Sequence, residues 1–257
     1  KDFIKKFKLS SFLVPLSSAI FANSPIKESK LNGYLSYRTH VWQNTSRGGL
    51  PKLFLEDMNF EKYVDMAINT SLLFIFKNGN YLKSNGKTFK DFMEGNILIS
   101  KNNKPSIKDF ETHLATIFNE VRLKKYIEIR SLDTCEWDCH CGGPAFYAGL
   151  IYGNLDEALE IIEHWKASEV LNAYLEVPKK GLNTIIKNRT LLEWGKIFLN
   201  LSKKGLQKRS IKNNKGKDET IFLRSIESVI NNNKNKASSA IEKFNTQKNL
   251  KFLYENV

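Results

Sequence analysis

The sequence predicts an α+β fold, and two features of its patterning support that class. Strand signals lie within residues 1–153: apolar and polar residues alternate over 124–133, and a turn at 78–80 indicates a hairpin. Helix patterns, separated by Gly, Pro and Lys/Asn breaks, fill most of residues 154–257. We therefore expect a mixed α+β part up to Gly153 and a C-terminal helical layer after it.

The α+β part is predicted to alternate helices and strands. Thr88 can cap one helix, and Ser106 with Asp109 three residues later has the pattern of a capping box for another. In chain order the predicted elements are a strand at 33–40, a helix at 60–67, strands at 72–76 and 81–83, helices at 88–94 and 106–118, a strand at 124–133 and a helix at 143–152.

The C-terminal part is predicted to be a layer of helices separated by breaks. Asn154 and Glu157 give its first helix a capping pattern. The predicted helices are 154–165, 168–174, 190–206, 218–230 and 237–244.

The composition indicates a globular chain with excess positive charge. Of 257 residues, 41% are hydrophobic and 26% are charged, and the formal net charge is +13. Such a surface attracts nucleotides, acidic metabolites, nucleic acid and anionic membranes alike. Much of the charge lies in Lys/Asn-rich stretches without interleaved aromatic residues, at 101–104, 212–217 and 231–236. We interpret these stretches as solvated loops and expect neither nucleic acid nor membrane as a partner.

Cysteine usage and the N-terminus bear on the cellular compartment. All three cysteines fall within 135–141, which is unlike a disulfide framework and favours a reducing compartment. Free thiols are the default interpretation of this cluster, and structural zinc is the alternative. Residues 1–22 have the basic and apolar order of a signal peptide, but Pro15 interrupts the apolar run. We expect a cytoplasmic protein, with secretion as the alternative.

Glu128 and Arg130 are the first candidates for chemistry. Two residues apart on one predicted strand, they project from the same face. A carboxylate can hold Mg²⁺, and a guanidinium can bind phosphate oxygens through two hydrogen bonds, as phosphoryl transfer requires. The alternative is an ordinary amphipathic strand with a solvated charged face.

Arg38 and His113 are further candidates. Arg38, in the predicted strand at 33–40, could clamp a substrate carboxylate or stack on a neighbouring aromatic ring. His113 lies alone on a predicted helix, where a histidine is more often a structural residue than a ligand.

Five segments follow one another in a specific order along nearly the whole chain. They are 22–25 (ANSP), 33–42 (GYLSYRTHVW), 60–67 (FEKYVDMA), 113–133 (HLATIFNEVRLKKYIEIRSLD) and 144–152 (PAFYAGLIY). Together they resemble the motifs of glutamate–cysteine ligases of the plant and alphaproteobacterial type. The resemblance implies a glutamine-synthetase-like fold, in which an open antiparallel sheet holds nucleotide, metal and amino acid on its concave face. It also implies that the apparent signal peptide is an internal segment.

The resemblance implies a reaction as well. Such enzymes use ATP to join the γ-carboxyl of glutamate to the amine of cysteine through a γ-glutamyl phosphate, the first step of glutathione biosynthesis. Glu128 matches a Mg²⁺ ligand, and Arg130 matches an arginine that contacts the transferring phosphoryl group. Arg122 would bind ATP together with Arg130.

The resemblance also assigns the amino-acid site and the domains. Arg38 matches an arginine that holds the glutamate substrate, and Asn23 and Ser24 would line the same pocket. Residues 1–153 would form the C-terminal part of the ligase catalytic domain, and residues 154–257 a helical extension packed on it.

The resemblance further indicates what this chain lacks. The first metal-binding carboxylates of the family lie before the region that matches Lys1. The chain alone is therefore expected to be inactive and to need the N-terminal half of the same enzyme. The alternatives are a related carboxylate–amine ligase that uses another amine, and a non-catalytic basic binding module.

Overall fold

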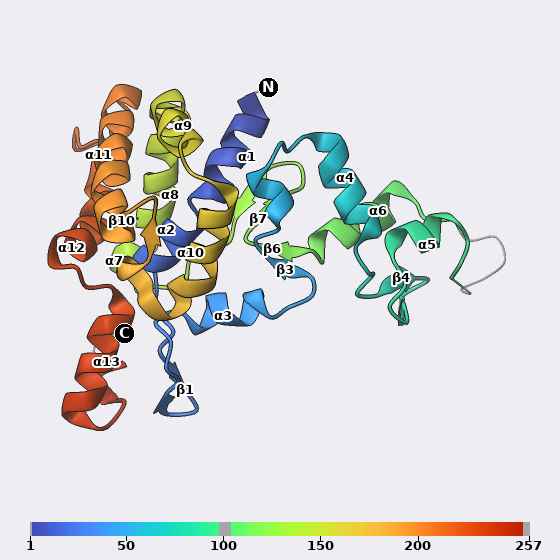
Figure 1. Ribbon diagram of the computed structural model, residues 1–257, viewed down its shortest axis with the longest axis horizontal. Helices are drawn as coiled ribbons and strands as arrows, with labels where there is room; N and C mark the ends of the chain where they lie inside the picture. Colours follow the sequence, from blue (N-terminus) through green and yellow to red (C-terminus); the bar gives the residue numbers. More distant parts are fainter. Residues whose placement is uncertain (1, 98–103, 254–257) are drawn as a thin grey trace.

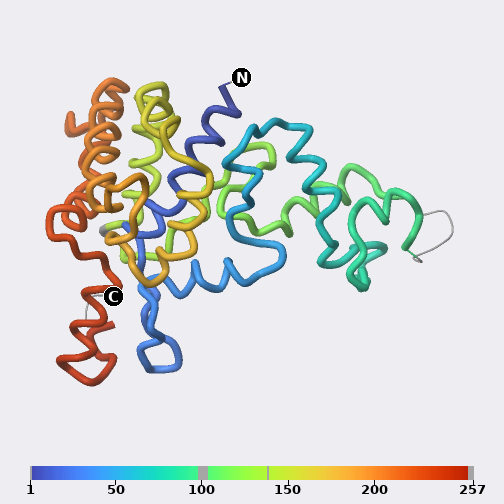
Figure 2. The backbone as a smooth tube through the Cα atoms, in the orientation of Figure 1, coloured from blue at the N-terminus to red at the C-terminus, as the bar shows by residue number. Residues whose placement is uncertain are grey.

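A computed structural model describes residues 2–97 and 104–253 of the chain. Helices α1, α2 and α7–α12 form one body, from which helices α4–α6 extend to one side (Figure 1). The trace runs from the N-terminal helices out to this side lobe and then returns to the body (Figure 2). The helices of the first part are α1 (Asp2–Phe12), α2 (Val14–Ile20), α3 (Tyr37–Gln43), α4 (Phe60–Asn69), α5 (Phe89–Met93) and α6 (Ile107–Ala115).

The strands are short, and those described pair two by two. The antiparallel pairs are β1 (Ile26–Lys27) with β2 (Lys30–Leu31), β4 (Ile75–Lys77) with β5 (Asn80–Leu82), β7 (Val121–Leu123) with β8 (Ile127–Ile129), and β9 (Ile185–Ile186) with β10 (Arg189–Thr190). Strands β3 (Gly48–Gly49) and β6 (Phe118–Asn119) pair in parallel. The mixture of helices and strands confirms the α+β class.

The rest of the described chain is mostly helical, with the β9–β10 hairpin between α10 and α11. Its helices are α7 (Trp137–His140), α8 (Gly142–Ala148), the π-helical turn η2 (Gly149–Gly153), α9 (Leu155–Glu163), α10 (Ala167–Lys180), α11 (Leu191–Arg209), α12 (Arg224–Asn232) and α13 (Lys236–Gln247). Short 3₁₀ turns are η1 (Lys52–Leu55), η3 (Gly181–Asn183), η4 (Glu219–Leu223) and η5 (Lys251–Leu253). Each helix predicted after residue 153 is therefore present, with shifted ends.

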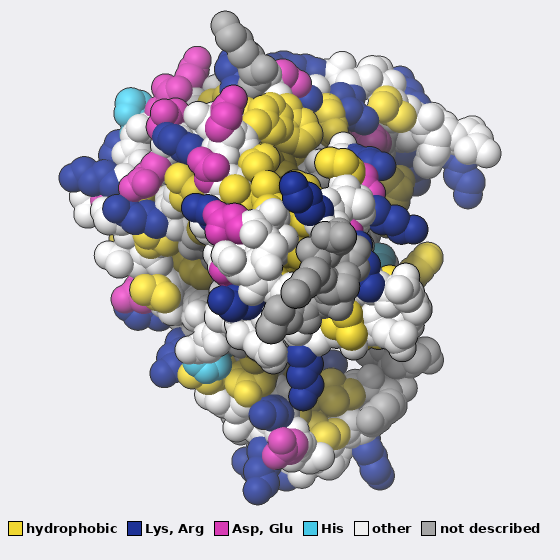
Figure 3. All heavy atoms as spheres, turned by 90° about the vertical axis from the view of Figure 1, so that its right-hand side faces the viewer, with side chains coloured by type: hydrophobic (Ala, Val, Ile, Leu, Met, Phe, Trp, Pro, Cys, Tyr) yellow, Lys and Arg dark blue, Asp and Glu magenta, His cyan; other side chains and the backbone are white. Residues whose placement is uncertain are grey.

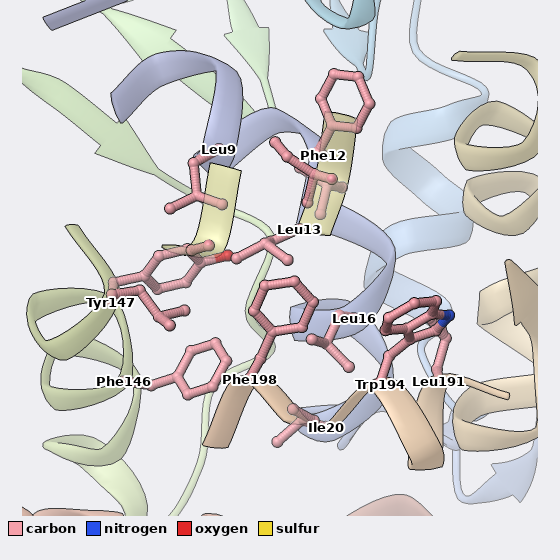
Figure 4. Close-up of a cluster of buried hydrophobic side chains, with 14 of the residues drawn as sticks. Leu9, Phe12, Leu13, Leu16, Ile20, Phe146, Tyr147, Leu191, Trp194 and Phe198 are labelled. Atoms are coloured by element: carbon pink, nitrogen blue, oxygen red, sulfur yellow. The ribbon is translucent and has the colours of Figure 1, made fainter. Parts of the chain in front are cut away.

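The N-terminal helices lie at the centre of the core. Leu16 of α2 is fully buried, close to Phe146 of α8 and Phe198 of α11 (Figure 4). Buried serines of this segment donate to carbonyls one turn back, as Ser11 does to Phe7 at 2.9 Å, which lets polar residues lie in an apolar interior. The predicted leader-like segment is thus a core element. The core draws on residues from both sides of position 153, and the division there stays a prediction.

Several local predictions in the side lobe are confirmed. Thr88 and Ser106 each form a capping box, with Asp91 and Asp109 respectively. The hairpin turns at Asn78 and Gly79, whose positive φ angles of 50° and 79° suit Asn and Gly.

The predicted strand at 33–40 is wrong, because helix α3 begins within it. The Ser36 hydroxyl accepts a hydrogen bond from the Thr39 amide and so caps the helix. The amides of Leu35 and Ser36 donate to the carbonyl of Pro178 at 2.7 and 3.1 Å. These long-range hydrogen bonds hold the extended segment before the helix, so the alternating residues of 33–40 do not form a strand.

Two other elements are shorter than predicted. Strand β8 covers only Ile127–Ile129 of the predicted 124–133, because the segment after Arg130 bonds mainly to serine side chains, as where Ser18 donates to the Ser131 carbonyl at 3.1 Å. Helix α6 ends at Ala115 instead of near Phe118, because Phe118 pairs with β3.

The free-thiol interpretation is wrong for two of the three cysteines. Cys135 and Cys139 form a disulfide, with their Cα atoms 6.0 Å apart, and Cys141 is free and exposed. Helix α7 begins between the two and turns Cys139 back toward Cys135. Within residues 2–97 and 104–253, no group of three or more His, Cys, Asp or Glu residues is arranged to hold a metal ion.

The surface distributes its positive charge widely. On the face at the side lobe, Lys and Arg side chains alternate with acidic and apolar ones (Figure 3). In the part of the chain that the structure describes, no helix is both long enough and apolar enough to cross a membrane.

The π-helical turn η2 and helix α11 meet through glycines, which yields a test of the packing. A Cβ atom at Gly205 would lie 1.9 Å from the carbonyl oxygen of Gly149. We expect Gly205→Ala to lower the free energy of unfolding by about 1–3 kcal/mol because the helices must separate. Chemical denaturation measures this, with the exposed Lys204→Ala on the same helix as control; equal stability of the two variants would contradict the close packing.

Candidate active site

Strands β7 and β8 bring two Glu-x-Arg patterns together. Glu120 and Arg122 lie on one arm of this hairpin, and Glu128 and Arg130 lie on the other. Arg122 is directly opposite Glu128 in the register, and the Arg130 amide donates to the Glu120 carbonyl at 2.8 Å. Opposite charges therefore face each other across the hairpin, which stabilises its pairing.

Glu128 is held by two arginines. Arg122 donates to both carboxylate oxygens at 2.7–3.0 Å, and Arg130 Nη1 donates to Oε1 at 2.9 Å. Partial burial raises the pKa of the Glu128 carboxyl, but the hydrogen bonds from Arg122 and Arg130 outweigh it and hold the pKa below its usual range. The carboxylate thus stays ionised at neutral pH.

Arg122 is the most enclosed of these arginines. Its side chain is 8% exposed, and its Nη1 donates to the carbonyls of Ala115 and Ile117 at 2.6 and 3.2 Å. The contacts tie helix α6 to the hairpin. The predicted ATP-binding arginine therefore also holds the backbone in place.

The partly exposed Arg130 side chain places its guanidinium beside two aromatic rings. The guanidinium carbon lies 5.7 Å from the ring centroids of both Trp42 and Phe118, within the range of cation–π attraction. Its Nε is buried and has no hydrogen-bond partner among the described residues. The rings thus flank a cation that keeps a donor which the described residues do not use.

Arg38 joins this cluster from helix α3. Its guanidinium donates to Glu120 at 3.2 Å and to the carbonyl oxygen of Arg130. Its backbone amide donates to the Ser24 hydroxyl at 3.1 Å. Arg38 therefore lies beside the segment that carries Glu128 and Arg130, although about 90 residues of sequence separate them.

Glu120 is the residue that the sequence analysis missed. Its side chain is fully buried and accepts hydrogen bonds from Arg38 and from the Tyr174 hydroxyl, the latter at 3.0 Å. Burial raises the pKa of the Glu120 carboxyl, while Arg38 and Tyr174 oppose that shift. The repeat of Glu-x-Arg at 120–122 and 128–130 was the signal that could have revealed it.

Asn23 and Ser24 are positioned by Asp133. Asp133 Oδ2 accepts hydrogen bonds from the backbone amide of Asn23 at 2.9 Å and from the Ser24 hydroxyl at 2.6 Å. Oδ1 accepts one from the Ser36 hydroxyl at 2.8 Å. Asn23 and Ser24 also line a cavity of about 670 Å³ next to α13. The described lining of that cavity includes none of Arg38, Glu128 and Arg130, so Ser24 connects to them through its bond to the Arg38 amide.

Two buried basic residues near α6 have structural contacts. His113 Nε2 lies 2.8 Å from the Ala67 carbonyl, and its ring stacks on Phe89; burial lowers its pKa. Arg47 donates to the Thr116 carbonyl and hydroxyl at 2.8 and 2.6 Å. Both join neighbouring elements, in agreement with the structural interpretation of His113.

Comparison with known proteins identifies the family. The sequence profile of glutamate-cysteine ligase family 2 matches residues 1–251. The chain belongs to this family. It is 37% identical over 252 residues to the chloroplastic glutamate–cysteine ligase B of Oryza sativa subsp. japonica, covering 96% of this chain and 50% of the relative.

Two further relatives give the same result. The chloroplastic glutamate–cysteine ligase of Solanum lycopersicum is 37% identical over 246 residues, covering 94% of this chain and 46% of the relative. That of Arabidopsis thaliana is 36% identical over 249 residues, covering 95% and 47%. The chain spans about half the length of these curated relatives. The family resemblance seen in the sequence is thus confirmed.

The Mg²⁺ that the ligase family implies does not fit Glu128 alone. Both of its carboxylate oxygens accept from arginines, and Lys124 Nζ lies 3.7 Å away. A hard cation prefers several oxygen ligands, and in the described residues no cluster of acidic groups supplies them. The arginines, by contrast, fit an anionic ligand.

The lowered pKa of Glu128 makes stability depend on pH in a defined sense. A carboxyl whose folded-state pKa lies below its unfolded value of about 4.3 stabilises the fold above that value and loses this contribution as pH falls through the folded-state pKa. We expect Glu128→Gln to cost about 1–3 kcal/mol at pH 7 because both arginines lose their charged acceptor.

Thermal unfolding at pH 7 and below pH 4 measures the effect. The melting temperature of Glu128→Gln should lie below that of the natural chain at pH 7, and this gap should shrink in acid. The control Glu61→Gln, an exposed change on α4, should melt close to the natural chain at both pH values. A difference that is constant with pH would contradict the ion pairs at Glu128.

Proposed function

We propose that the chain is the C-terminal portion of a glutamate–cysteine ligase. Such an enzyme uses ATP to join the γ-carboxyl of glutamate to the amine of cysteine, the first step of glutathione biosynthesis. One observation supports this most. Arg38 contacts the segment that carries Glu128 and Arg130, although the two lie far apart in the sequence, and the chain belongs to the ligase family. The proposed substrates are glutamate, cysteine and ATP.

The proposed reaction has two steps. The γ-carboxylate of glutamate attacks the γ-phosphorus of ATP, and ADP leaves with the electrons of the broken P–O bond. The cysteine amine then attacks the resulting acyl phosphate, inorganic phosphate leaves, and the amine loses a proton. Negative charge develops on phosphoryl oxygens in the first step and on the acyl oxygen in the second.

The arginines are assigned distinct parts in this scheme. Arg130, beside the rings of Trp42 and Phe118, would contact the transferring phosphoryl group, and Arg122 would support ATP binding. Arg38 would hold the glutamate substrate, with Asn23 and Ser24 beside it. A guanidinium fixed before substrate arrives stabilises developing charge without having to reorganise.

The wider architecture is part of the same proposal. We assign β7 and β8 to a glutamine-synthetase-like antiparallel sheet that the N-terminal half of the enzyme would complete, together with the carboxylates for Mg²⁺. Residues 1–153 would belong to the catalytic domain and residues 154–257 to a helical extension. The two-stranded pairs support this assignment because such pairs are marginal by themselves.

The test of activity uses the complete ligase and the chain alone. With ATP, glutamate and cysteine, the complete protein should form γ-glutamylcysteine and phosphate, and the chain alone should form neither. Other amines in place of cysteine test the specificity. Product with another amine but none with cysteine would replace this proposal with a related ligase, and no product with any amine would reject ligase activity.

Arg38 gives a sharper prediction for substrate binding. We expect Arg38→Ala to raise the glutamate KM at least about tenfold and the ATP KM far less, because a bidentate charged contact to a carboxylate is lost. Arg38→Lys keeps a charge opposite Glu120 and should remain folded while losing the two-pronged contact. Lys30→Ala, a loss of positive charge on the exposed β1–β2 hairpin, serves as control. Equal changes in both KM values would refute the assignment.

A further inference from the structure

The Arg38 guanidinium is oriented by a buried carboxylate. Arg38 Nη1 and Nη2 each lie 3.2 Å from Glu120 Oε2, and Nη2 also donates to the Arg130 carbonyl. The Glu120 side chain is 0% exposed, whereas the Arg38 side chain is 23% exposed. Glu120 therefore holds both Nη atoms of the guanidinium from the interior, while part of the Arg38 side chain stays exposed.

Glu120 is in turn oriented by the helical part of the chain. The Tyr174 hydroxyl of α10 donates to Glu120 Oε1 at 3.0 Å, which is the oxygen farther from Arg38. The Tyr174 carbonyl accepts a hydrogen bond from the Gln43 side chain at the end of α3. One residue of α10 thus contacts both the carboxylate and the helix that carries Arg38.

Stability alone does not account for this arrangement. A buried ion pair gains little over well-packed apolar side chains, because both charges lose hydration. What a buried, fully bonded carboxylate adds is a single orientation for its partner. The cost of burial is then consistent with a group that must meet a substrate in a fixed geometry.

We propose that Glu120 and Tyr174 are positioning residues for Arg38. Glu120 fixes the guanidinium plane, and Tyr174 fixes Glu120, so that α10 sets the affinity of the site for the glutamate carboxylate. This inference rests on the proposed function for the identity of the substrate. The positioning itself is a property of the chain and can be measured without turnover.

The first experiment measures kinetics of the complete ligase. Tyr174→Phe keeps the ring and removes the hydroxyl, and we expect it to raise the glutamate KM by about three- to tenfold, as the loss of one hydrogen bond would, with the ATP KM and kcat within about twofold. Glu120→Gln keeps the shape but removes the charge, and a larger rise in the glutamate KM is expected. An unchanged glutamate KM in Tyr174→Phe, or equal changes in the ATP KM, would overturn the proposal.

Tyr147→Phe is the matched control. Tyr147 is another buried tyrosine, on α8, and its hydroxyl forms no hydrogen bond with Arg38 or Glu120. The same chemical change there should leave the glutamate KM unchanged. A similar rise in both tyrosine variants would indicate a general packing effect and would count against positioning.

A second experiment separates positioning from catalysis. In protein labelled with ¹⁵N-arginine, Arg38 should give slowly rotating guanidinium NMR signals, assigned by their loss in Arg38→Lys. We expect these signals to broaden or average in Tyr174→Phe and to persist in Tyr147→Phe. If the unsubstituted complete ligase lacked activity, the proposed function would fail, while this measurement would still decide the positioning. Unchanged Arg38 signals in Tyr174→Phe would reject it.

Discussion

The buried carboxyl group of Glu120 is the constraint around which this part of the molecule is arranged. A charge in the interior is tolerated only when its hydrogen-bonding capacity is filled, and here separate elements supply the partners. Arg38 comes from α3, Tyr174 comes from α10, and the backbone of Glu120 bonds to Gly49 and Arg130. Displacing α3 or α10 would leave the carboxyl group short of a partner, so the relative positions of these two helices are coupled.

Helix α10 has a larger part in the site than its place in the sequence indicates. Its Pro178 carbonyl accepts the amides that precede α3, and its Tyr174 carbonyl accepts from Gln43 at the other end of that helix. The core beneath α10 is built around α2, which was also the source of the leader-like pattern at the N-terminus. The helical part therefore supports Arg38 directly, and it shares its core with the α+β part.

The sequence was informative where local chemistry decided the outcome and less so where distant partners did. Thr88 and Ser106 cap helices as predicted, since a cap needs only the next three residues. Residues 33–40 were misread because the Pro178 carbonyl, far along the chain, holds the segment before α3. Glu128 and Arg130 were found as a pair, but Glu120 was missed because its partners come from two distant helices. The disulfide between Cys135 and Cys139 depended on where α7 begins.

The balance of charge at the site explains why it suits anions. Among the described residues, Arg38, Arg122, Arg130 and Lys124 pair with two carboxyl groups, those of Glu120 and Glu128, so the cluster holds more basic than acidic side chains. The two carboxyl groups accept from the guanidiniums and help to hold these side chains in place. The side chains of Arg38 and Arg130 are 23% and 21% exposed, and Arg130 Nε has no partner among the described residues. A carboxylate or phosphate that binds here would therefore contact cations that are already oriented. Folding has already removed much of the water around these cations, and electrostatic contacts are strongest under that condition.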